Sequence, residues 1–178
     1  MNQGSSIKVA VVGASGYSGE ELVHRLLHHP CAELTTITSR QFADQALSKI
    51  FPRFTGQGVA DTLKFTEPDP YVLADTAEIV FLALPHGAAA EYTQEMLENY
   101  SRISDLSADF RLSNPAVYEE FYGDKHPSPN LLHEAVYGLP ELYRKEIHAA
   151  KLVASPGCYP TSILLPTVPL LKEGLIKP

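Results

Sequence analysis

Residues 7–19 of the 178-residue chain read IKVAVVGASGYSG, a run of mostly β-branched residues followed by three evenly spaced glycines. Residues 7–12 fit a buried strand of a parallel sheet, because such strands are covered on both faces. Residues 20–29 place leucine and valine at helical spacing until Pro30 ends the pattern. A second strand is predicted at residues 34–38. The order strand, helix, strand is the unit from which open parallel sheets are built.

The same alternation continues along the chain. Residues 77–84 form the clearest candidate strand, and residues 88–100 are rich in helix formers. Further short strands are predicted at residues 103–106 and 152–154. This pattern predicts an α/β fold, a Rossmann-type doubly wound parallel sheet, and we assign it to residues 1–155.

Two segments of mixed composition interrupt the alternation. Residues 41–67 contain Pro52, Gly56 and Gly58, and residues 114–139 carry several prolines and two glycines. These two residue types are the strongest local signals for turns. We therefore predict a loop-rich segment at residues 41–67 and an ordered loop at residues 114–139.

The composition describes an ordinary globular chain with an acidic balance. Lysine and arginine number 14 against 21 aspartate and glutamate residues, so the formal net charge is −7. No basic stripe typical of nucleic-acid binding is visible. No apolar run reaches the roughly 18 residues of a membrane helix, and the first residues lack a signal-peptide pattern. We expect a soluble, cytoplasmic protein with neither a nucleic-acid nor a membrane partner.

The sequence contains two sets of possible metal ligands, and neither set has both the spacing and the number of ligands typical of a metal site. Cys31 and Cys158 lie far apart and form no zinc pattern. His24 and His28 are four residues apart on a predicted helix, but no third ligand is nearby. These histidines are more typical of a helix surface, and we predict no metal site.

The glycines between the first strand and the first helix predict a phosphate-binding turn. Glycine permits a tight turn, close approach of backbone amides to a pyrophosphate and close helix packing, while the helix N-terminus favours an anion. The spacing G-x-x-G-x-x-G differs from the dinucleotide fingerprint, so a turn without a ligand is the alternative. The context favours a dinucleotide, with these binding residues: Gly13, Ser15, Gly16, Tyr17, Ser18 and Gly19.

The end of the second strand indicates which dinucleotide is bound. Sites specific for NAD place a carboxylate there, on the ribose 2′-hydroxyl. This chain has Ser39 and Arg40 instead, and a hydroxyl with a guanidinium suits a 2′-phosphate. We predict NADP as the cofactor, and a solvated Arg40 without a ligand is the alternative.

Cys158 is a candidate nucleophile. It lies between the strand predicted at residues 152–154 and an apolar run, so a helix starting there would place the thiol at its N-terminus. That position favours the thiolate and hence covalent catalysis, whereas Cys31 has no such setting. The alternative is that Cys158 is a small buried hydrophobic residue.

Arg111 follows another strand end. Its planar guanidinium could hold a carboxylate or a phosphate of the substrate. An ion pair with nearby Asp109 is the structural alternative.

The sequence resembles the N-acetyl-γ-glutamyl-phosphate reductases, NADP-dependent enzymes of arginine biosynthesis. The resemblance covers nearly the whole chain and is carried by residues 13–22, 81–87, 105–112, 137–142 and 153–161. Ser162 and Pro166 stand where the family has small residues, which questions the regularity of a helix there.

The resemblance implies a reaction and its participants. The Cys158 thiolate would attack the acyl phosphate and expel phosphate, and hydride from NADPH would reduce the thioester to N-acetylglutamate semialdehyde. It further implies that Leu84, Pro85 and His86 lie beside the nicotinamide, with His86 a neighbour of the cofactor and not the catalytic acid. The acid/base histidine would lie beyond Pro178.

Family members are about twice as long as this chain, so the resemblance implies an N-terminal fragment. Residues 156–178 would begin a truncated α+β catalytic and dimerisation domain, and the full-length protein would be a homo-oligomer.

Three alternatives remain open at the level of the sequence. A reductase of N-acetyl-aminoadipyl phosphate in lysine biosynthesis acts on a substrate only one methylene longer, and pockets discriminate one methylene weakly. Aspartate-semialdehyde dehydrogenase shares the chemistry, but an Asn-Cys-Thr-Thr setting is expected for its nucleophile, and Cys158 lies between Gly157 and Tyr159. A non-catalytic module that senses NADP would need the glycine turn but no reactive thiol.

Overall fold

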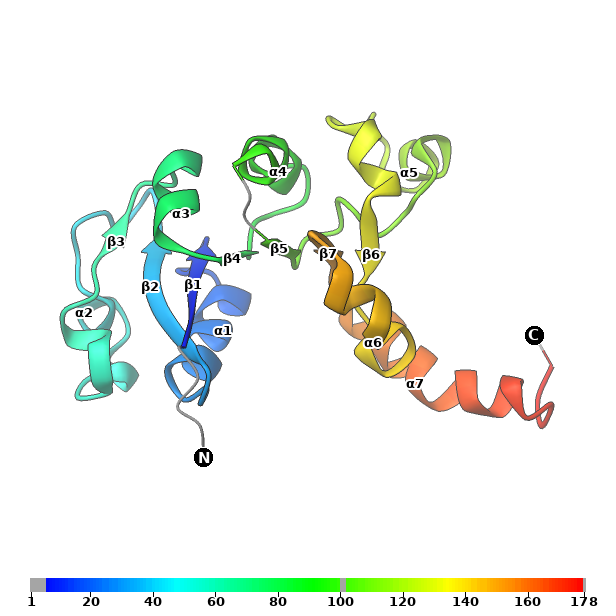
Figure 1. The fold of residues 1–178 in the computed structure, drawn as a ribbon, viewed down its shortest axis with the longest axis horizontal. Helices are drawn as coiled ribbons and strands as arrows, with labels where there is room; N and C mark the ends of the chain where they lie inside the picture. Colours follow the sequence, from blue (N-terminus) through cyan, green and yellow to red (C-terminus); the bar gives the residue numbers. More distant parts are fainter. Residues whose placement is uncertain (1–5, 100–101, 178) are drawn as a thin grey trace.

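In the computed structural model, which describes residues 6–99 and 102–177, seven strands form one parallel sheet of order β3-β2-β1-β4-β5-β7-β6 (Figure 1). The predicted α/β fold with a doubly wound parallel sheet is confirmed. The strands are β1 (Ile7–Val12), β2 (Ala32–Thr38), β3 (Phe65–Thr66), β4 (Ile79–Leu82), β5 (Arg102–Asp105), β6 (Ala135–Tyr137) and β7 (Leu152–Ala154).

Helices lie on both sides of the central strands, with α1 on one side and α3 and α4 on the other (Figure 1). Among the described residues, no helix has the length and apolar character needed to cross a membrane. The α-helices are α1 (Tyr17–Leu27), α2 (Leu47–Ile50), α3 (Pro70–Thr76), α4 (Ala89–Glu98), α5 (Pro115–Tyr122), α6 (Pro140–Ala149) and α7 (Cys158–Lys172), and the 3-10 turns are η1 (Pro52–Phe54), η2 (Gly58–Asp61) and η3 (Pro129–His133).

Alternate residues of β1 divide the core into two clusters. Val9 and Val11 pack on the side of α1, in a cluster that contains Val23. Ala10 and Val12 belong to the cluster on the side of α3 and α4. Both faces of the strand are therefore buried, which explains why its sequence is almost continuously apolar.

The elements predicted from apolar runs agree with the structure to within a few residues. The first strand has the predicted bounds, while α1 begins at Tyr17, three residues earlier than predicted. The predicted strand at 152–154 is β7. The helix predicted at 88–100 is α4, and Tyr100 lies outside the described residues.

The prediction that residues 114–139 are an ordered loop is wrong, whereas residues 41–67, predicted to be loop-rich, contain only short elements. Residues 41–67 contain α2, two 3-10 turns and the edge strand β3, and residues 114–139 contain α5, η3 and β6. Proline acts here as a start signal, because Pro115 is the first residue of α5 and the Asn114 side chain caps the helix by accepting from Ala116 N. Gly123 then ends α5 with a φ of 84°.

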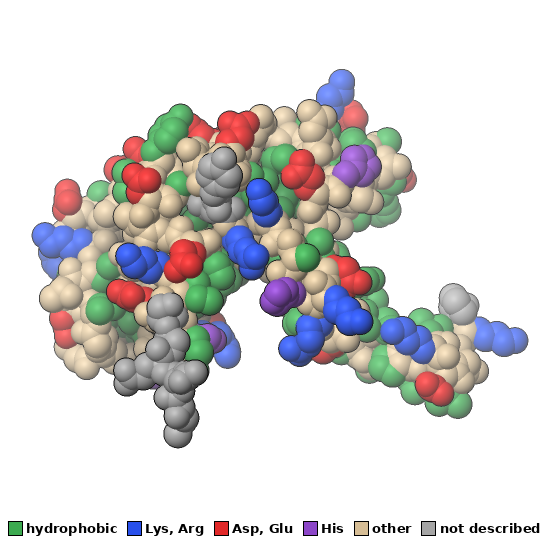
Figure 2. All heavy atoms as spheres, viewed as in Figure 1, with side chains coloured by type: hydrophobic (Ala, Val, Ile, Leu, Met, Phe, Trp, Pro, Cys, Tyr) green, Lys and Arg blue, Asp and Glu red, His purple; other side chains and the backbone are tan. Residues whose placement is uncertain are grey.

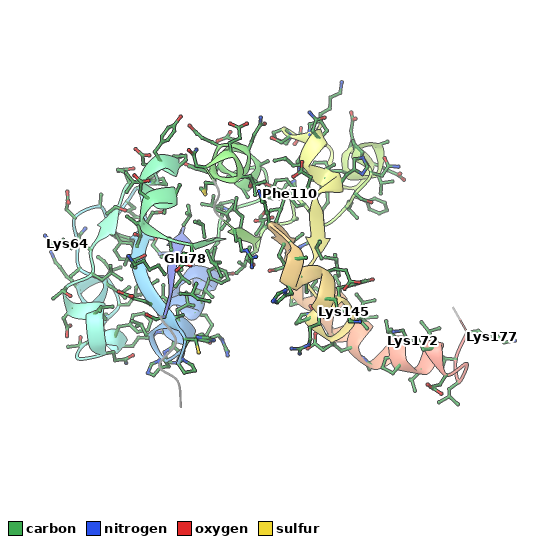
Figure 3. All side chains as sticks on the ribbon, viewed as in Figure 1. Lys64, Glu78, Phe110, Lys145, Lys172 and Lys177 are labelled. Atoms are coloured by element: carbon green, nitrogen blue, oxygen red, sulfur yellow. The ribbon has the colours of Figure 1, made fainter. Side chains whose placement is uncertain are left out.

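The helix α7 extends away from the sheet and carries Lys172 near its far end (Figures 1 and 3). It stays helical through Pro166 and Pro169, so the question raised by Pro166 is settled in favour of a continuous helix. Hydrophobic side chains are exposed along this arm (Figure 2), including Tyr159, Ile163, Leu165, Leu170 and Leu171.

The carboxylate of Asp109, which is fully buried, connects the loop after β5 to the start of α4. Its Oδ1 accepts from Gly87 N at 2.7 Å and lies 2.9 Å from His86 Nδ1. Its Oδ2 accepts from Ala89 N at 3.1 Å and Ala90 N at 3.2 Å. Since the helix has no side-chain cap of its own, Asp109 supplies the cap from a distant part of the sequence.

Asp105, at the end of β5, is a second buried carboxylate. Its oxygens accept from the backbone N and the Oγ of Ser107, at 2.9 and 2.8 Å. Burial raises the pKa of Asp105 from 3.8 to about 6, and the bonds from Ser107 oppose this rise in part.

We predict that Asp109→Asn lowers the free energy of unfolding by about 2–4 kcal/mol, because an amide group would face backbone N–H groups in place of a carboxylate oxygen. The measurement is urea unfolding followed by circular dichroism. Asp69→Asn is the matched control. Asp69 caps α3 through a single oxygen, Oδ1, and asparagine is an equally good cap, so the expected change is under about 0.5 kcal/mol. Equal effects of the two substitutions would contradict the role of Asp109.

We predict a pH-dependent effect of Asp105→Asn. Because folding raises the pKa of Asp105, the folded chain keeps the proton of this carboxyl up to a higher pH than the unfolded chain does. Ionising the buried carboxyl therefore destabilises the folded state more and more as the pH rises from about 4 to about 6. The stability gained by the neutral variant, relative to the parent chain, should therefore increase by about 2 kcal/mol between pH 4.5 and 7.5. Urea unfolding at the two pH values measures it, and a difference independent of pH would exclude this explanation.

Candidate functional site

The glycine turn between β1 and α1 packs tightly against its neighbours. Gly13 has a φ of +78°, and a Cβ at this position would collide with the carbonyl oxygen of Ala83. A Cβ on Gly19, in the first turn of α1, would collide with the Gly13 carbonyl oxygen and lie 2.7 Å from Ala14 Cα. Glycine is required at both positions for the helix to start directly on the strand end.

The structure corrects the extent of this turn. Tyr17, Ser18 and Gly19 belong to α1, and Gly16 is the residue before the helix. Gly16 has no side chain that could cap the first N–H groups, and Tyr17 is 96% exposed. The helix N-terminus is therefore accessible and suited to an anion such as a pyrophosphate.

Hydrogen bonds join the glycine turn to the end of β2. Gly13 N donates to Thr38 Oγ1 at 3.3 Å, and the Oγ atoms of Ser15 and Ser39 lie 2.9 Å apart. Arg40, the next residue, is exposed and donates from Nη2 to Tyr92 Oη at 2.7 Å. The end of β2 thus faces both the turn and α4.

A cleft of about 360 Å³ lies between these segments. It brings together residues that the sequence predicted separately, which are Gly13, Ser15, Ser39, Arg40, Leu84 and Pro85. The other predicted residues, Gly16, Tyr17, Ser18, Gly19 and His86, are not among those that line it. A larger hollow of about 480 Å³ includes Ile7 and Arg102, at the amino ends of strands, whereas open α/β sheets bind ligands at the carboxyl ends.

Sequence reasoning missed part of the cleft wall. Tyr92 and Glu91, from the first turn of α4, line it together with Gln41 and Pro68. The position of α4 directly after the central strand β4 was a usable signal, because helix starts at this edge of the sheet face ligands.

His86 lies in the turn between β4 and α4, with 38% of its side chain exposed. A carboxylate can only accept, so His86 Nδ1 donates to Asp109, and in the neutral ring Nε2 accepts from Tyr118 Oη, 3.3 Å away. Burial raises the pKa of Tyr118 to about 12, which keeps the hydroxyl proton in place. Both ring nitrogens of His86 are therefore engaged within the protein.

Arg111 has backbone partners in place of the ion pair considered with Asp109. Its Nε donates to Ser155 O at 2.8 Å, and its Nη2 donates to Leu106 O at 3.0 Å. A Cβ on Gly157 would lie 3.1 Å from Nη1. Arg111 therefore holds the turn between β7 and α7, with Nη1 beside the residue that precedes Cys158.

Cys158 is the first residue of α7, as the sequence predicted, and its side chain is exposed. This excludes the alternative of a buried hydrophobic residue. Gly157, the residue before the helix, has no side chain that could cap the first N–H groups. Cys31 is also exposed, but it directly precedes β2 and does not begin a helix. In the described parts of the chain, no three His, Cys, Asp or Glu side chains could hold a metal ion.

Comparison with known proteins identifies close relatives in sequence. The chain is 56% identical over 173 residues to the N-acetyl-gamma-glutamyl-phosphate reductase of Akkermansia muciniphila, covering 97% of this chain and 50% of the relative. The enzyme of the same name from Nitrosococcus oceani is 47% identical over 172 residues, which are 97% of this chain and 49% of the relative. The chain thus spans about half the length of these curated relatives.

Solved structures share the fold at low sequence identity. Aspartate semialdehyde dehydrogenase with NADP from Candida albicans superposes with a TM-score of 0.64 at 16% identity, over 95% of this chain and 48% of the other. The family model described as semialdehyde dehydrogenase, NAD binding domain, matches residues 8–150. The chain therefore belongs to the semialdehyde dehydrogenase family and carries its NAD-binding domain.

Proposed function

We propose that this chain is the cofactor-binding part of an NADPH-dependent N-acetyl-γ-glutamyl-phosphate reductase of arginine biosynthesis. The observation that carries the proposal is that the cleft and Cys158 lie at the same edge of the sheet. Both follow the carboxyl ends of parallel strands, where enzymes that use dinucleotides bind their cofactors and substrates. The identity of 44–56% to eight reductases of this name supports it.

The residues present fit NADP. The pyrophosphate would lie at the N-terminus of α1, against the turn from Gly13 to Gly19, and the 2′-phosphate would be held by Ser39 and Arg40. Leu84, Pro85 and His86 would flank the nicotinamide. When bound, NADPH supplies the hydride that reduces the acyl group.

Cys158 would act as the nucleophile. Its thiolate forms a bond to the acyl carbon while the bond from that carbon to the phosphate oxygen breaks, so phosphate leaves with the electron pair. After reduction, the former carbonyl oxygen takes a proton from an acid/base group, and that group takes the proton back as the bond between sulfur and carbon breaks. The aldehyde is then released and the electron pair returns to sulfur as the thiolate. By the resemblance this acid/base group is a histidine beyond Pro178.

Arg111 would hold the substrate. With Nε and Nη2 bound to backbone oxygens, Nη1 is the part of the fork left to hold a phosphate or carboxylate beside Cys158. The two tethers also fix the guanidinium before the substrate arrives, which lowers the entropic cost of binding.

We further propose that residues 1–155 form the cofactor-binding domain and residues 156–178 begin a second, α+β domain for catalysis and dimerisation. The match of the family model to residues 8–150 and the exposed apolar side chains of α7 support this division. The complete protein would be a cytoplasmic homo-oligomer. The lysine-pathway substrate differs by one methylene, and no described residue favours it.

We predict that the 178-residue chain, shown to be folded by circular dichroism, binds NADPH more tightly than NADH. Arg40→Ala should raise the dissociation constant for NADPH about 10- to 100-fold, because a charge-assisted contact is lost, and leave that for NADH nearly unchanged. Fluorescence titration measures both. Binding of neither cofactor by the folded chain, or equal binding of both, would refute this cofactor assignment.

We predict that iodoacetamide alkylates Cys158 at least about fivefold faster than Cys31, because only Cys158 lies at a helix N-terminus. Both thiols are exposed, so access alone does not separate them. Peptide mass spectrometry against time gives both rates in one sample, with Cys158→Ser as the control for site assignment. Equally slow alkylation of both cysteines would favour a module that senses NADP over an enzyme.

A further inference from the structure

One hydrogen bond crosses the cleft between segments 52 residues apart. Arg40 Nη2, after β2, donates to Tyr92 Oη, on α4, at 2.7 Å. Both residues line the cleft. The contact is shorter than the usual 2.9–3.0 Å of such bonds, as expected when the donor is charged.

The two partners differ in how firmly they are held. The ring of Tyr92 is half-buried and packs against the core cluster on the α3 and α4 side of the sheet. Arg40 is exposed and reaches the cleft on a long side chain with many rotamers. The hydroxyl is thus a fixed point that limits where the mobile guanidinium can lie.

The chemistry of the hydroxyl also matters. Glu91 is the carboxylate that lines this cleft, and pairing with it would neutralise Arg40. A tyrosine hydroxyl is neutral, so it orients the guanidinium without cancelling the charge. The bond to Tyr92 uses one of the five N–H donors of the Arg40 guanidinium, and the remaining N–H groups can donate to a phosphate.

We propose that Tyr92 is a positioning residue that selects NADP(H) over NAD(H) by holding the guanidinium of Arg40 at the cleft. The inference rests on the proposed function, in which Arg40 binds the 2′-phosphate. Tyr92 acts on the cofactor through Arg40, so its hydroxyl affects only the ligand that carries this phosphate.

The test is Tyr92→Phe, which removes the hydroxyl and keeps the ring that packs on the core. The dissociation constant of the chain for NADPH should rise about three- to tenfold, and that for NADH should change less than twofold. The matched control is Tyr71→Phe, an exposed tyrosine on α3 that does not line the cleft, and both constants should then stay unchanged.

The double variant Arg40→Ala, Tyr92→Phe supplies the second readout. Without the guanidinium, loss of the hydroxyl should have no further effect on NADPH binding, which shows that Tyr92 acts through Arg40. An equal loss for NADPH and NADH would overturn the inference, since Tyr92 would then be only part of the cleft wall. Unchanged or tighter NADPH binding by Tyr92→Phe would overturn it as well.

The same variants separate this inference from the proposed function. If Arg40→Ala weakens NADPH binding but Tyr92→Phe does not, the inference fails while the cofactor assignment stands. If Arg40→Ala leaves the ratio of NADPH to NADH affinity unchanged, the assignment of Arg40 to the 2′-phosphate fails, and the inference fails with it.

Discussion

The buried carboxylate of Asp109 is the constraint on which the rest of the site depends. A charge in the core is unfavourable unless hydrogen bonds compensate it, and Asp109 gains three backbone N–H donors and the ring of His86. These partners belong to the turn after β4 and the first turn of α4. The same turn and helix form one wall of the cleft. Asp109 therefore fixes the shape of the cleft, although it does not itself line it.

The cleft itself is built mainly from backbone geometry at the ends of parallel strands. The close approach of Gly13 to Ala83, and of Gly19 to Gly13, places the start of α1 beside the ends of β1 and β4. Few side-chain contacts add to this backbone frame. One of them, between Arg40 and Tyr92, crosses the cleft. Arg111 and Cys158 follow a different pair of strands, β5 and β7, so the cleft and the exposed thiol lie at neighbouring parts of one sheet edge.

Local patterns predicted the parts of this molecule that depend on local physics. Apolar runs gave β1 and β7, and the position of Cys158 at the start of α7 followed from the order of strand and helix. The helix α5 was missed because proline and glycine were taken as loop signals where they begin and end a helix. The contact of Arg40 with Tyr92 and that of Arg111 with Ser155 could not be predicted, because each joins residues more than forty positions apart.

The order of these residues along the chain has a consequence for divergence within the family. The residues that line the cofactor cleft all lie between Val12 and Tyr92, whereas Arg111 and Cys158 come later. The stretch that lines the cleft and the stretch that carries Arg111 and Cys158 therefore follow one another along the chain. Under the proposed function, a lineage could change the residues around Cys158 without rebuilding the cleft, provided that the carboxylate at Asp109 continues to join the two stretches.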